Sequence, residues 1–360
     1  MNKKNYFTKF FTFFIALTSL LVSCNNEEDD EVNGLYHNGI FIVNEGTYGA
    51  NNSSVSFYHL EGDSVINSIF ETANDRPLGD VAQSIAIHNN KAFVVVNVSN
   101  KIEIVNAEDF KEIKTIENLH EPRFVAFAAN KAFVTEWGNN GEVSAINLTD
   151  YTVSTIDVGN APEGILAFND KLYVANSGGF VTDSTVSVID AATNQVIATI
   201  FTPHNPKALV VDKNEKIWVL CHGAVVYDPV TYEIVFESAS KLVQIDPATN
   251  TVIKEIVVSE NTHPSGLQIN PEGDKLFVGG GFGFQGIYQV NITDNQIPAT
   301  LWNDKFLYGF FVHPTTGDVF LLEAPDFTSA GKMYRYSSAG QLLGTFETGI
   351  APSNACSYKK

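Results

Sequence analysis

Short runs of apolar residues recur along the chain at intervals of 40 to 59 residues. A continuous apolar run of this kind is typical of a strand that is covered on both faces. The seven runs are IFIVNEG (40–46), AFVVVN (92–97), AFVTEW (132–137), LYVANSG (172–178), IWVLCHG (217–223), LFVGGG (276–281) and VFLLEA (319–324). Their recurrence predicts a repeat fold, in which each repeat buries its apolar faces against its neighbours.

Segments in which apolar and polar residues alternate follow the apolar runs. In the fourth repeat, TVSVID (185–190) and QVIATI (195–200) alternate with the period of two that is typical of half-buried strands. Asp190 to Asn194 between them have the composition of a turn, and the same strand–turn–strand pattern returns at 240–256. A unit of four strands in about 40 residues is typical of a β-propeller blade.

A further strand-like segment precedes every apolar run except the first, and one more segment of this kind follows the last run. Of these seven inner segments, 78–87 and 306–312 lack an opening proline, and the other five open with Pro122, Pro162, Pro206, Pro264 and Pro352. The last of them, 351–358, has no repeat after it. We therefore predict an all-β fold, a seven-bladed β-propeller over 39–360, whose C-terminal strand joins the first blade and closes the ring.

The first 38 residues have the features of an export signal and a tether. Basic residues precede an apolar run (10–22) that is shorter than a membrane span, so we predict a signal peptide at 1–23. The run ends in LVSC, which resembles the bacterial lipobox and predicts lipidation of Cys24; an ordinary secretory signal is the alternative. The acidic residues 27–31 predict a flexible tether over 24–38, which is either a solvated spacer or a signal for the outer face of the outer membrane.

The composition narrows the classes of partner. The formal net charge is −19, and an acidic surface repels phosphate backbones, so we predict no nucleic-acid partner. Besides Cys24, the chain has only Cys221 and Cys356, both in apolar segments. We predict that they are buried free thiols, with a bond between them as the alternative.

Extra residues collect in the loops between the second and third strands of the blades, which share one end of a propeller. Insertions on one face of a repeat fold often mark its binding face. We expect three or four of the loop aromatics to reach solvent and the others to fold onto blade edges; they are Tyr48, Trp137, Phe180, Tyr227, Tyr232, Phe282, Phe284 and Phe327. The predicted ligand-binding residues are Asn44, Glu45, Tyr48, Gln83, Asn97, Arg123, Trp137, Asn176, His222, Tyr227, Phe282, Phe284 and Asp326.

More polar residues are expected at this end, in the connections from one blade to the next. They are Asp80, Gln83, His120, Arg123, Glu163, His204, Lys207 and His263. His120, His204 and His263 lie just before blade-opening prolines and could ligate a metal or a metal-bearing cofactor. Because they belong to different blades, we interpret them as turn residues and predict no metal site.

Sequence motifs of enzymes are missing. The glycine-rich stretch 279–283 follows a predicted strand but precedes no helix, and the chain has no GxSxG or HExxH pattern. Convergence of Glu45, Glu136, Glu163 and Glu323 on a metal, as in lactonase-type propellers, is the enzymatic alternative. We predict a non-enzymatic protein that requires no cofactor.

The repeat over about 39–358 resembles that of the YncE-like, or YVTN, seven-bladed propellers. Several stretches also resemble a narrower group, the BtuG-type surface lipoproteins: GIFIVNEGTYG (39–49), LGDVAQSIAI (78–87), FKEIKTI (110–116), EPRFVAF (121–127) and KAFVTEW (131–137). This resemblance implies capture of cobalamin outside the cell and its transfer to a TonB-dependent outer-membrane transporter. It is strongest over the first three blades and weakens across 176–302.

Together, these features predict a lipid-anchored, non-enzymatic propeller on the cell surface, attached to the outer membrane. Its loop face is expected to capture a ligand, with cobalamin or another corrinoid as the leading candidate, for an associated transporter. The alternatives are a surface interaction or adhesion scaffold without a small ligand, and a metal-dependent lactonase or other hydrolase. An aromatic-rimmed basin would favour the first function, a flat aromatic face the second, and converging carboxylates the third.

Overall fold

The computed structural model describes residues 34–360. The predicted signal peptide, Cys24 and most of the predicted tether lie outside the described residues. Within the described part, no helix has both the length and the apolar composition that a membrane span requires.

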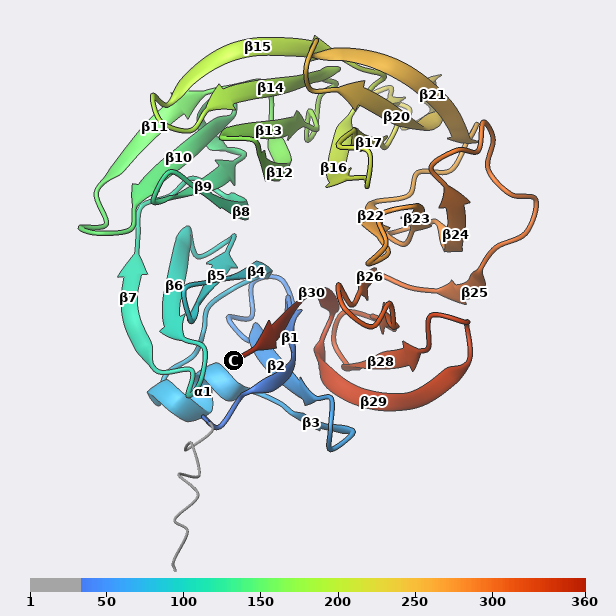
Figure 1. Cartoon of the computed structure of the whole chain (residues 1–360). Helices are drawn as coiled ribbons and strands as arrows, with labels where there is room; N and C mark the ends of the chain where they lie inside the picture. The colour runs from blue at the N-terminus through green and yellow to red at the C-terminus, as the bar shows by residue number, and fades with distance from the viewer. Residues whose placement is uncertain (1–33) are drawn as a thin grey trace, which may run out of the picture. The chain divides into compact units, whose positions relative to one another are not determined.

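Seven four-stranded antiparallel sheets surround a central axis as the blades of a propeller (Figure 1). Blade 1 comprises β30 (Pro352–Lys359), β1 (Asn38–Asn44), β2 (Ser54–His59) and β3 (Ser64–Ile66). Blade 2 comprises β4 (Ala82–His88), β5 (Lys91–Val96), β6 (Lys101–Asn106) and β7 (Glu112–Ile116). Blade 3 comprises β8 (Pro122–Ala128), β9 (Lys131–Glu136), β10 (Glu142–Asn147) and β11 (Val153–Asp157). Blade 4 comprises β12 (Pro162–Phe168), β13 (Lys171–Asn176), β14 (Thr185–Asp190) and β15 (Gln195–Phe201).

The remaining three blades repeat this order from the axis outward. Blade 5 comprises β16 (Pro206–Val211), β17 (Ile217–Cys221), β20 (Ser240–Asp246) and β21 (Thr251–Ser259). Blade 6 comprises β22 (Gly266–Ile269), β23 (Lys275–Gly279), β24 (Gln285–Asn291) and β25 (Asn303–Phe306). Blade 7 comprises β26 (Gly309–Val312), β27 (Val319–Glu323), β28 (Ala330–Tyr336) and β29 (Leu342–Ile350). A short helix, α1 (Ile69–Asn74), and a hairpin of β18 (Val225–Tyr227) and β19 (Ile234–Glu237) are additions to this plan.

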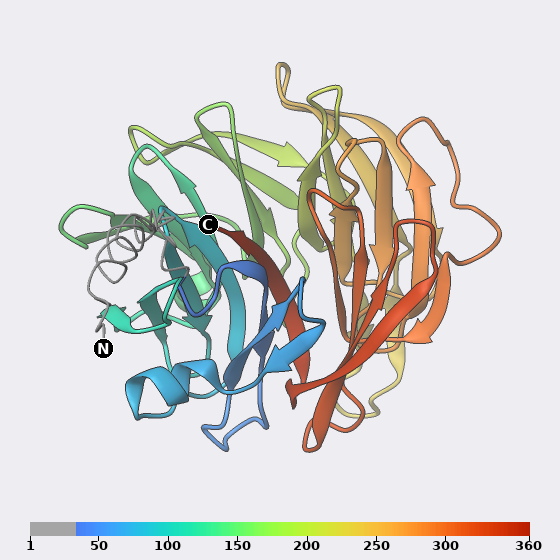
Figure 2. The ribbon, with the colours of Figure 1, turned by 60° about the horizontal axis from the view of Figure 1, so that its bottom comes forward.

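The C-terminal strand closes the ring, as predicted. β30 pairs antiparallel with β1 and places Phe41 opposite Cys356. Figures 1 and 2 show this strand, in dark red, beside the blue strands of blade 1. Because the inner edge of blade 1 is supplied by the far end of the chain, the two ends of the propeller hold each other in place.

The core is divided into seven apolar clusters, one between each pair of neighbouring blades, within the described residues. β1 contributes to two of them, since Ile40 and Ile42 pack against blade 7 while Phe41 and Val43 pack against blade 2. Alternate side chains of a strand point to opposite faces. A neighbouring blade covers each face of the second strand, which explains why the predicted apolar runs are continuous.

The propeller begins slightly before the predicted boundary at residue 39. β1 starts at Asn38, and the Tyr36 side chain is only 2% exposed. Its ring contacts Phe41 and Phe57 at centroid distances of 6.1 and 5.0 Å. Residues 36–38 therefore belong to the packed domain rather than to the predicted tether, because a buried aromatic ring anchors them.

Candidate functional site

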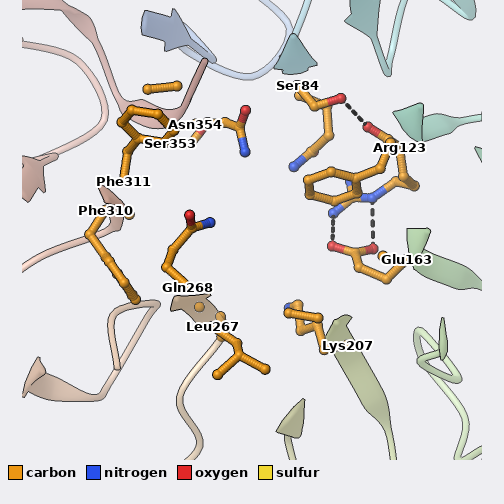
Figure 3. Close-up of a pocket in the computed structure, with 18 of the residues that line it drawn as sticks. Ser84, Arg123, Glu163, Lys207, Leu267, Gln268, Phe310, Phe311, Ser353 and Asn354 are labelled. Carbon is orange, nitrogen blue, oxygen red and sulfur yellow. Dashed lines mark hydrogen bonds and ion pairs between the residues drawn. The ribbon is translucent and has the colours of Figure 1, made fainter. Parts of the chain in front are cut away.

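A cavity of about 600 Å³ lies on the axis of the ring. Its wall is formed by the inner strands of all seven blades, and Figure 3 shows side chains that project into it. Part of the wall is apolar, with Leu267, Phe310 and Phe311, and part carries amides, with Gln268 and Asn354. This volume is within the range of small-molecule sites in proteins.

Seven polar side chains surround the mouth of the cavity at the end where the inner strands begin. They occupy the same place in each blade, directly after the opening proline or its counterpart. This mouth ring consists of Gln83, Arg123, Glu163, Lys207, Ser265, Tyr308 and Ser353. Each of the seven side chains lines the cavity, so a ligand at the mouth would meet one polar group from every blade.

The backbone explains why these side chains face the axis. In five blades the pairing of the inner strand skips the mouth-ring residue, as in a β-bulge. In the same five blades the residue two places earlier has a left-handed conformation; these are Val81, Glu121, Ala161, Asn205 and Ala351, with φ between 43° and 56°. A bulge turns an unpaired residue out of the regular alternation. The side chain is thereby directed into the cavity.

Arg123 and Glu163 form the central ion pair of the mouth ring. Arg123 donates from Nε and Nη2 to the two carboxylate oxygens of Glu163, at 2.9 and 2.8 Å (Figure 3). The guanidinium also lies 4.3 Å from the Trp137 ring. Burial alone would raise the pKa of Glu163, but the charges of Arg123 and Lys207 outweigh this effect and lower the pKa. Glu163 is therefore held as a carboxylate.

Glu45 and Tyr308 form a second pair beside it. The Tyr308 hydroxyl donates to Glu45 Oε2 at 3.0 Å. Burial raises the pKa of Glu45, and burial together with this carboxylate raises the pKa of Tyr308. Glu45 and Tyr308 therefore lose a proton less readily than the same groups would in water.

Lys207 differs from the other charged residues of the mouth ring. Its ammonium group has no hydrogen bond and no ion pair at contact distance within the described residues. Figure 3 places it across a gap from Glu163, on the neighbouring inner strand β16. Because a buried or half-buried cation gains from a partner, Lys207 can accept an anionic group from a ligand.

Exposed aromatic rings lie on the loops between the second and third strands, and one of them, Phe282, also lines the cavity. Phe180 is fully exposed and meets the Trp137 ring edge-on at a centroid distance of 6.1 Å. The exposed members of the predicted aromatic set are Tyr48, Phe180, Tyr227, Tyr232 and Phe282. Five rings therefore reach solvent, which exceeds the expected three or four, because the longer loops project beyond the blade edges.

Several predicted ligand-binding residues lie elsewhere. Asn44 and Asn176 are fully buried, and each donates to two hydroxyl groups of its own blade. Phe284 is buried in the cluster between blades 5 and 6, because the loop folds it inward. Asn97 donates to the carbonyl of Pro122 and does not line the cavity. These four side chains stabilise the blades, so their assignment to a ligand site is corrected.

Two further predicted residues, Asp326 and His222, also serve their own loops. Asp326 accepts hydrogen bonds from the backbone of Thr328 and Ser329, which lowers its pKa to about 2. His222 Nδ1 lies 3.0 Å from the carbonyl oxygen of Pro264. Burial lowers the pKa of His222 to about 4, and the charge of Lys207 adds to this effect. Neither side chain is part of the cavity wall.

The remaining predicted residues are close to the mouth or on the loop face. Glu45, Gln83, Arg123 and Phe282 line the cavity, and Trp137 supports Arg123. Tyr48 is exposed on a loop and Tyr227 on the β18–β19 hairpin. The prediction did not include Glu163, Lys207, Ser265, Tyr308 and Ser353 among the ligand-binding residues. The signal that identifies them is their shared position after the blade-opening proline, which a comparison of the seven repeats reveals.

The carboxylates of the enzymatic alternative do not form one group. Glu45 and Glu163 line the cavity, and Arg123 lies near both. Glu136 instead lies beside His120 in blade 3, and Glu323 accepts a hydrogen bond from the Tyr334 hydroxyl in blade 7. His204 and His263 likewise have separate local partners, Ser238 and Glu237.

Solved structures share this architecture at low sequence identity. A quinonprotein alcohol dehydrogenase-like protein from Bacteroides thetaiotaomicron is 15% identical, with a TM-score of 0.66, over 89% of this chain and 78% of that chain. A functionally unknown protein from Desulfotomaculum acetoxidans is 11% identical, with a TM-score of 0.64, over 89% and 99%. A protein from Lactobacillus plantarum is 13% identical, with a TM-score of 0.63, over 89% and 99%. These similarities support the propeller fold alone.

The sequence comparisons identify a family but no characterised relative. No curated protein matches the chain. The family model described as a domain of unknown function, DUF5074, matches residues 38–342, which covers most of the propeller. The chain therefore belongs to the DUF5074 family and folds as a seven-bladed β-propeller.

Proposed function

We propose that this protein is a non-enzymatic binding protein that captures a small ligand at the mouth of its axial cavity. The mouth ring is the observation that carries the proposal, because seven polar side chains from seven blades converge on one opening. A propeller is rigid, so a site built on its inner strands loses little entropy on binding. Glu136 and Glu323 lie outside the wall of the axial cavity, so the four carboxylates do not converge on one metal there, which supports a binding role for the cavity.

The chemistry of the site suits an amphipathic ligand with an anionic group. Lys207 offers an unpaired cation, Gln83 and Gln268 offer amides, and Phe310 and Phe311 offer apolar surface. Exposed Phe180 and Phe282 add flat apolar area outside the mouth. A ligand that is broader than the cavity would therefore lie over the mouth and direct its substituents inward.

Cobalamin or a related corrinoid is the leading candidate for this ligand. A corrin ring is broad and amphipathic, it carries amide side chains, and in cobalamin a phosphate links the ring to its nucleotide. The resemblance of the first three blades to the BtuG-type lipoproteins supports the same choice. In this proposal, the protein is anchored through Cys24 to the outer membrane, faces the outside of the cell and passes the ligand to a TonB-dependent transporter.

Isothermal titration of residues 34–360, whose ring is closed by its own strands, tests this proposal. We expect one-to-one binding of cyanocobalamin. Lys207→Gln should weaken it about tenfold through loss of one charge-assisted contact. Cobinamide lacks the nucleotide phosphate, so Lys207→Gln and the unchanged protein should bind it with equal affinity. Lys111→Gln, which removes an exposed charge from the β6–β7 turn, is the matched control.

Two results would overturn parts of the proposal. An absence of heat with cyanocobalamin and cobinamide at tens of micromolar would exclude corrinoids. Equal affinities of the Lys207→Gln and unchanged proteins for cyanocobalamin would show that the phosphate does not meet Lys207. Trp137→Ala should weaken both ligands, because Trp137 holds Arg123 in place.

A surface interaction scaffold is the second candidate, and the β18–β19 hairpin favours it. This hairpin exposes a cluster of large apolar side chains, namely Tyr227, Val230, Tyr232, Ile234 and Val235. Exposed apolar clusters of this size often mark protein-binding surfaces. Replacement of residues 225–237 by a short glycine-rich turn should abolish co-purification of an outer-membrane partner and leave corrinoid binding unchanged. Loss of corrinoid binding in this variant would instead assign the hairpin to the ligand site.

A further inference from the structure

Blade 3 carries a second cluster of polar side chains that is separate from the axial cavity. His120 lies just before β8, Glu136 ends β9, and Glu142 begins β10. β9 and β10 are neighbours in blade 3 (Figure 1), and their register places Glu136 directly opposite Glu142. One potential ligand atom from each of the three residues lies within 4.8 Å of the other two.

The separations are close to those between the ligand atoms of a metal site, and the shortest of them is also a hydrogen-bond distance. His120 Nδ1 lies 2.7 Å from Glu142 Oε1 and 3.7 Å from Glu136 Oε2. In a tetrahedral zinc site with metal–ligand distances of about 2.1 Å, the ligand atoms are roughly 3.4 Å apart. The two observed distances bracket this value, so small side-chain movements would complete a coordination sphere.

Glu136 supplies an independent sign that the cluster suits a cation. Its side chain is only 1% exposed; Oε2 accepts a hydrogen bond from the backbone N–H of His120, whereas Oε1 has no partner within the described residues. Neither Glu136 nor Glu142 forms an ion pair with a lysine or an arginine there. Two adjacent buried carboxylates repel each other, and an unpaired buried carboxylate oxygen is unfavourable.

The side-chain amide of Asn139 also belongs to this cluster. Its nitrogen donates to Glu142 Oε1 at 2.9 Å and lies 3.0 Å from His120 Nδ1. Reversal of the amide would turn its oxygen toward these groups instead. A cation between them would accept lone pairs from the imidazole, the carboxylates and the reversed amide together.

We propose that His120, Glu136 and Glu142 bind a divalent transition metal ion, with zinc as the best fit to one imidazole and two carboxylates. The His120 side chain is 52% exposed, which gives an ion access from solvent. Three protein ligands leave a position for water or for the amide oxygen of Asn139. The site is independent of the ligand proposed for the axial cavity.

Cobalt(II) titration of the full chain tests the site, because cobalt in a tetrahedral site has a visible absorption band. We expect a saturable band with one-to-one stoichiometry that zinc abolishes by competition. His120→Ala should lower the affinity more than about 100-fold, and Glu136→Gln should lower it by a similar factor. His204→Ala is the matched control, since His204, like His120, lies two residues before a blade-opening proline but contacts Ser238. It should leave the band unchanged.

A thermal unfolding series separates the metal site from a protonated carboxyl group. Zinc should raise the unfolding midpoint of the unchanged protein and leave that of His120→Ala unaffected, because only a bound ion stabilises the folded state. Two results together would overturn the proposal. Zinc would leave the unfolding midpoint of the unchanged protein unaffected, and Glu136→Gln would unfold at the same or a higher temperature than the unchanged protein. Equal cobalt spectra in the unchanged and His120→Ala proteins would also overturn it, since other residues would then hold the metal.

Discussion

Arg123 on β8 and Glu163 on β12 join neighbouring blades through two parallel hydrogen bonds of 2.9 and 2.8 Å. Both side chains are largely buried, with 14% and 4% exposure. Arg123 also lies over the Trp137 ring, which in turn makes an edge-on contact with the exposed Phe180. A continuous path of contacts therefore leads from the aromatic rings of the loop face to the mouth of the cavity.

Replacement of Glu163 should destabilise the propeller strongly. Glu163→Gln leaves the Arg123 charge buried without its carboxylate, and we expect a loss of about 3 kcal/mol in the free energy of unfolding. The control is Glu255→Gln, because Glu255 pairs with Lys241 at 3.0 Å on the surface and should contribute less than about 1 kcal/mol. Urea unfolding measures both values. Equal losses would show that burial adds nothing to the Arg123–Glu163 pair.

His222 should make the protein less stable in mild acid. Burial and the charges of Lys207 and His263 lower its pKa to about 4 in the folded state, whereas an unfolded histidine titrates near 6.5. Below pH 6.5 the unfolded chain thus binds the proton more readily, and stability falls as the pH decreases toward 4. The total contribution is up to about 3 kcal/mol. His222→Asn should remove this slope, and parallel stability curves for both proteins would contradict the assignment.

The two cysteines should react slowly with alkylating agents. Both are free thiols, in different blades; Cys221 is buried as predicted, whereas Cys356 is only partly buried and lines the axial cavity. Burial raises the pKa of Cys221 to about 12 and of Cys356 to about 11. At pH 8, iodoacetamide should modify Cys356 on the order of 100-fold more slowly than an exposed thiol. Peptide mass spectrometry follows the rate, and addition of urea should make both cysteines reactive. Rapid modification of Cys221 in the folded protein would contradict its burial.

Tyr36 should mark the true start of the propeller. Tyr36→Ala removes a ring that packs on Phe41, Phe57 and Phe110, and we expect a loss of about 3 kcal/mol. Leu35→Ala is the neighbouring control, because Leu35 is 61% exposed and its loss should change stability by less than about 0.5 kcal/mol. The midpoints of urea unfolding compare the two variants. Similar small effects would place residue 36 in the tether after all.

The fold follows from the sequence because its signals are local and repeated. The alternation in 185–190 and 195–200 has the period of a strand, and the turn Asp190 to Asn194 lies between them as predicted, with Asp190 accepting from the Thr193 backbone. The continuous run 40–46 indicates a strand with two covered faces. Seven such runs and one unpaired C-terminal segment leave ring closure as the simplest arrangement.

The site depends on distances that no local pattern contains. Phe282 and Phe284 are two residues apart in one loop, yet Phe282 is 83% exposed and Phe284 is 4% exposed. The packing of the folded loop determines which of the two rings turns inward, and the sequence pattern does not contain this information. The mouth ring needs the β-bulge that redirects one residue in each of five blades. His120, Glu136 and Glu142 meet because the β9–β10 register places one carboxylate opposite the other. The sequence by itself determined the blades and their order, and the tertiary structure decided which side chains meet between them, since such meetings depend on register and packing.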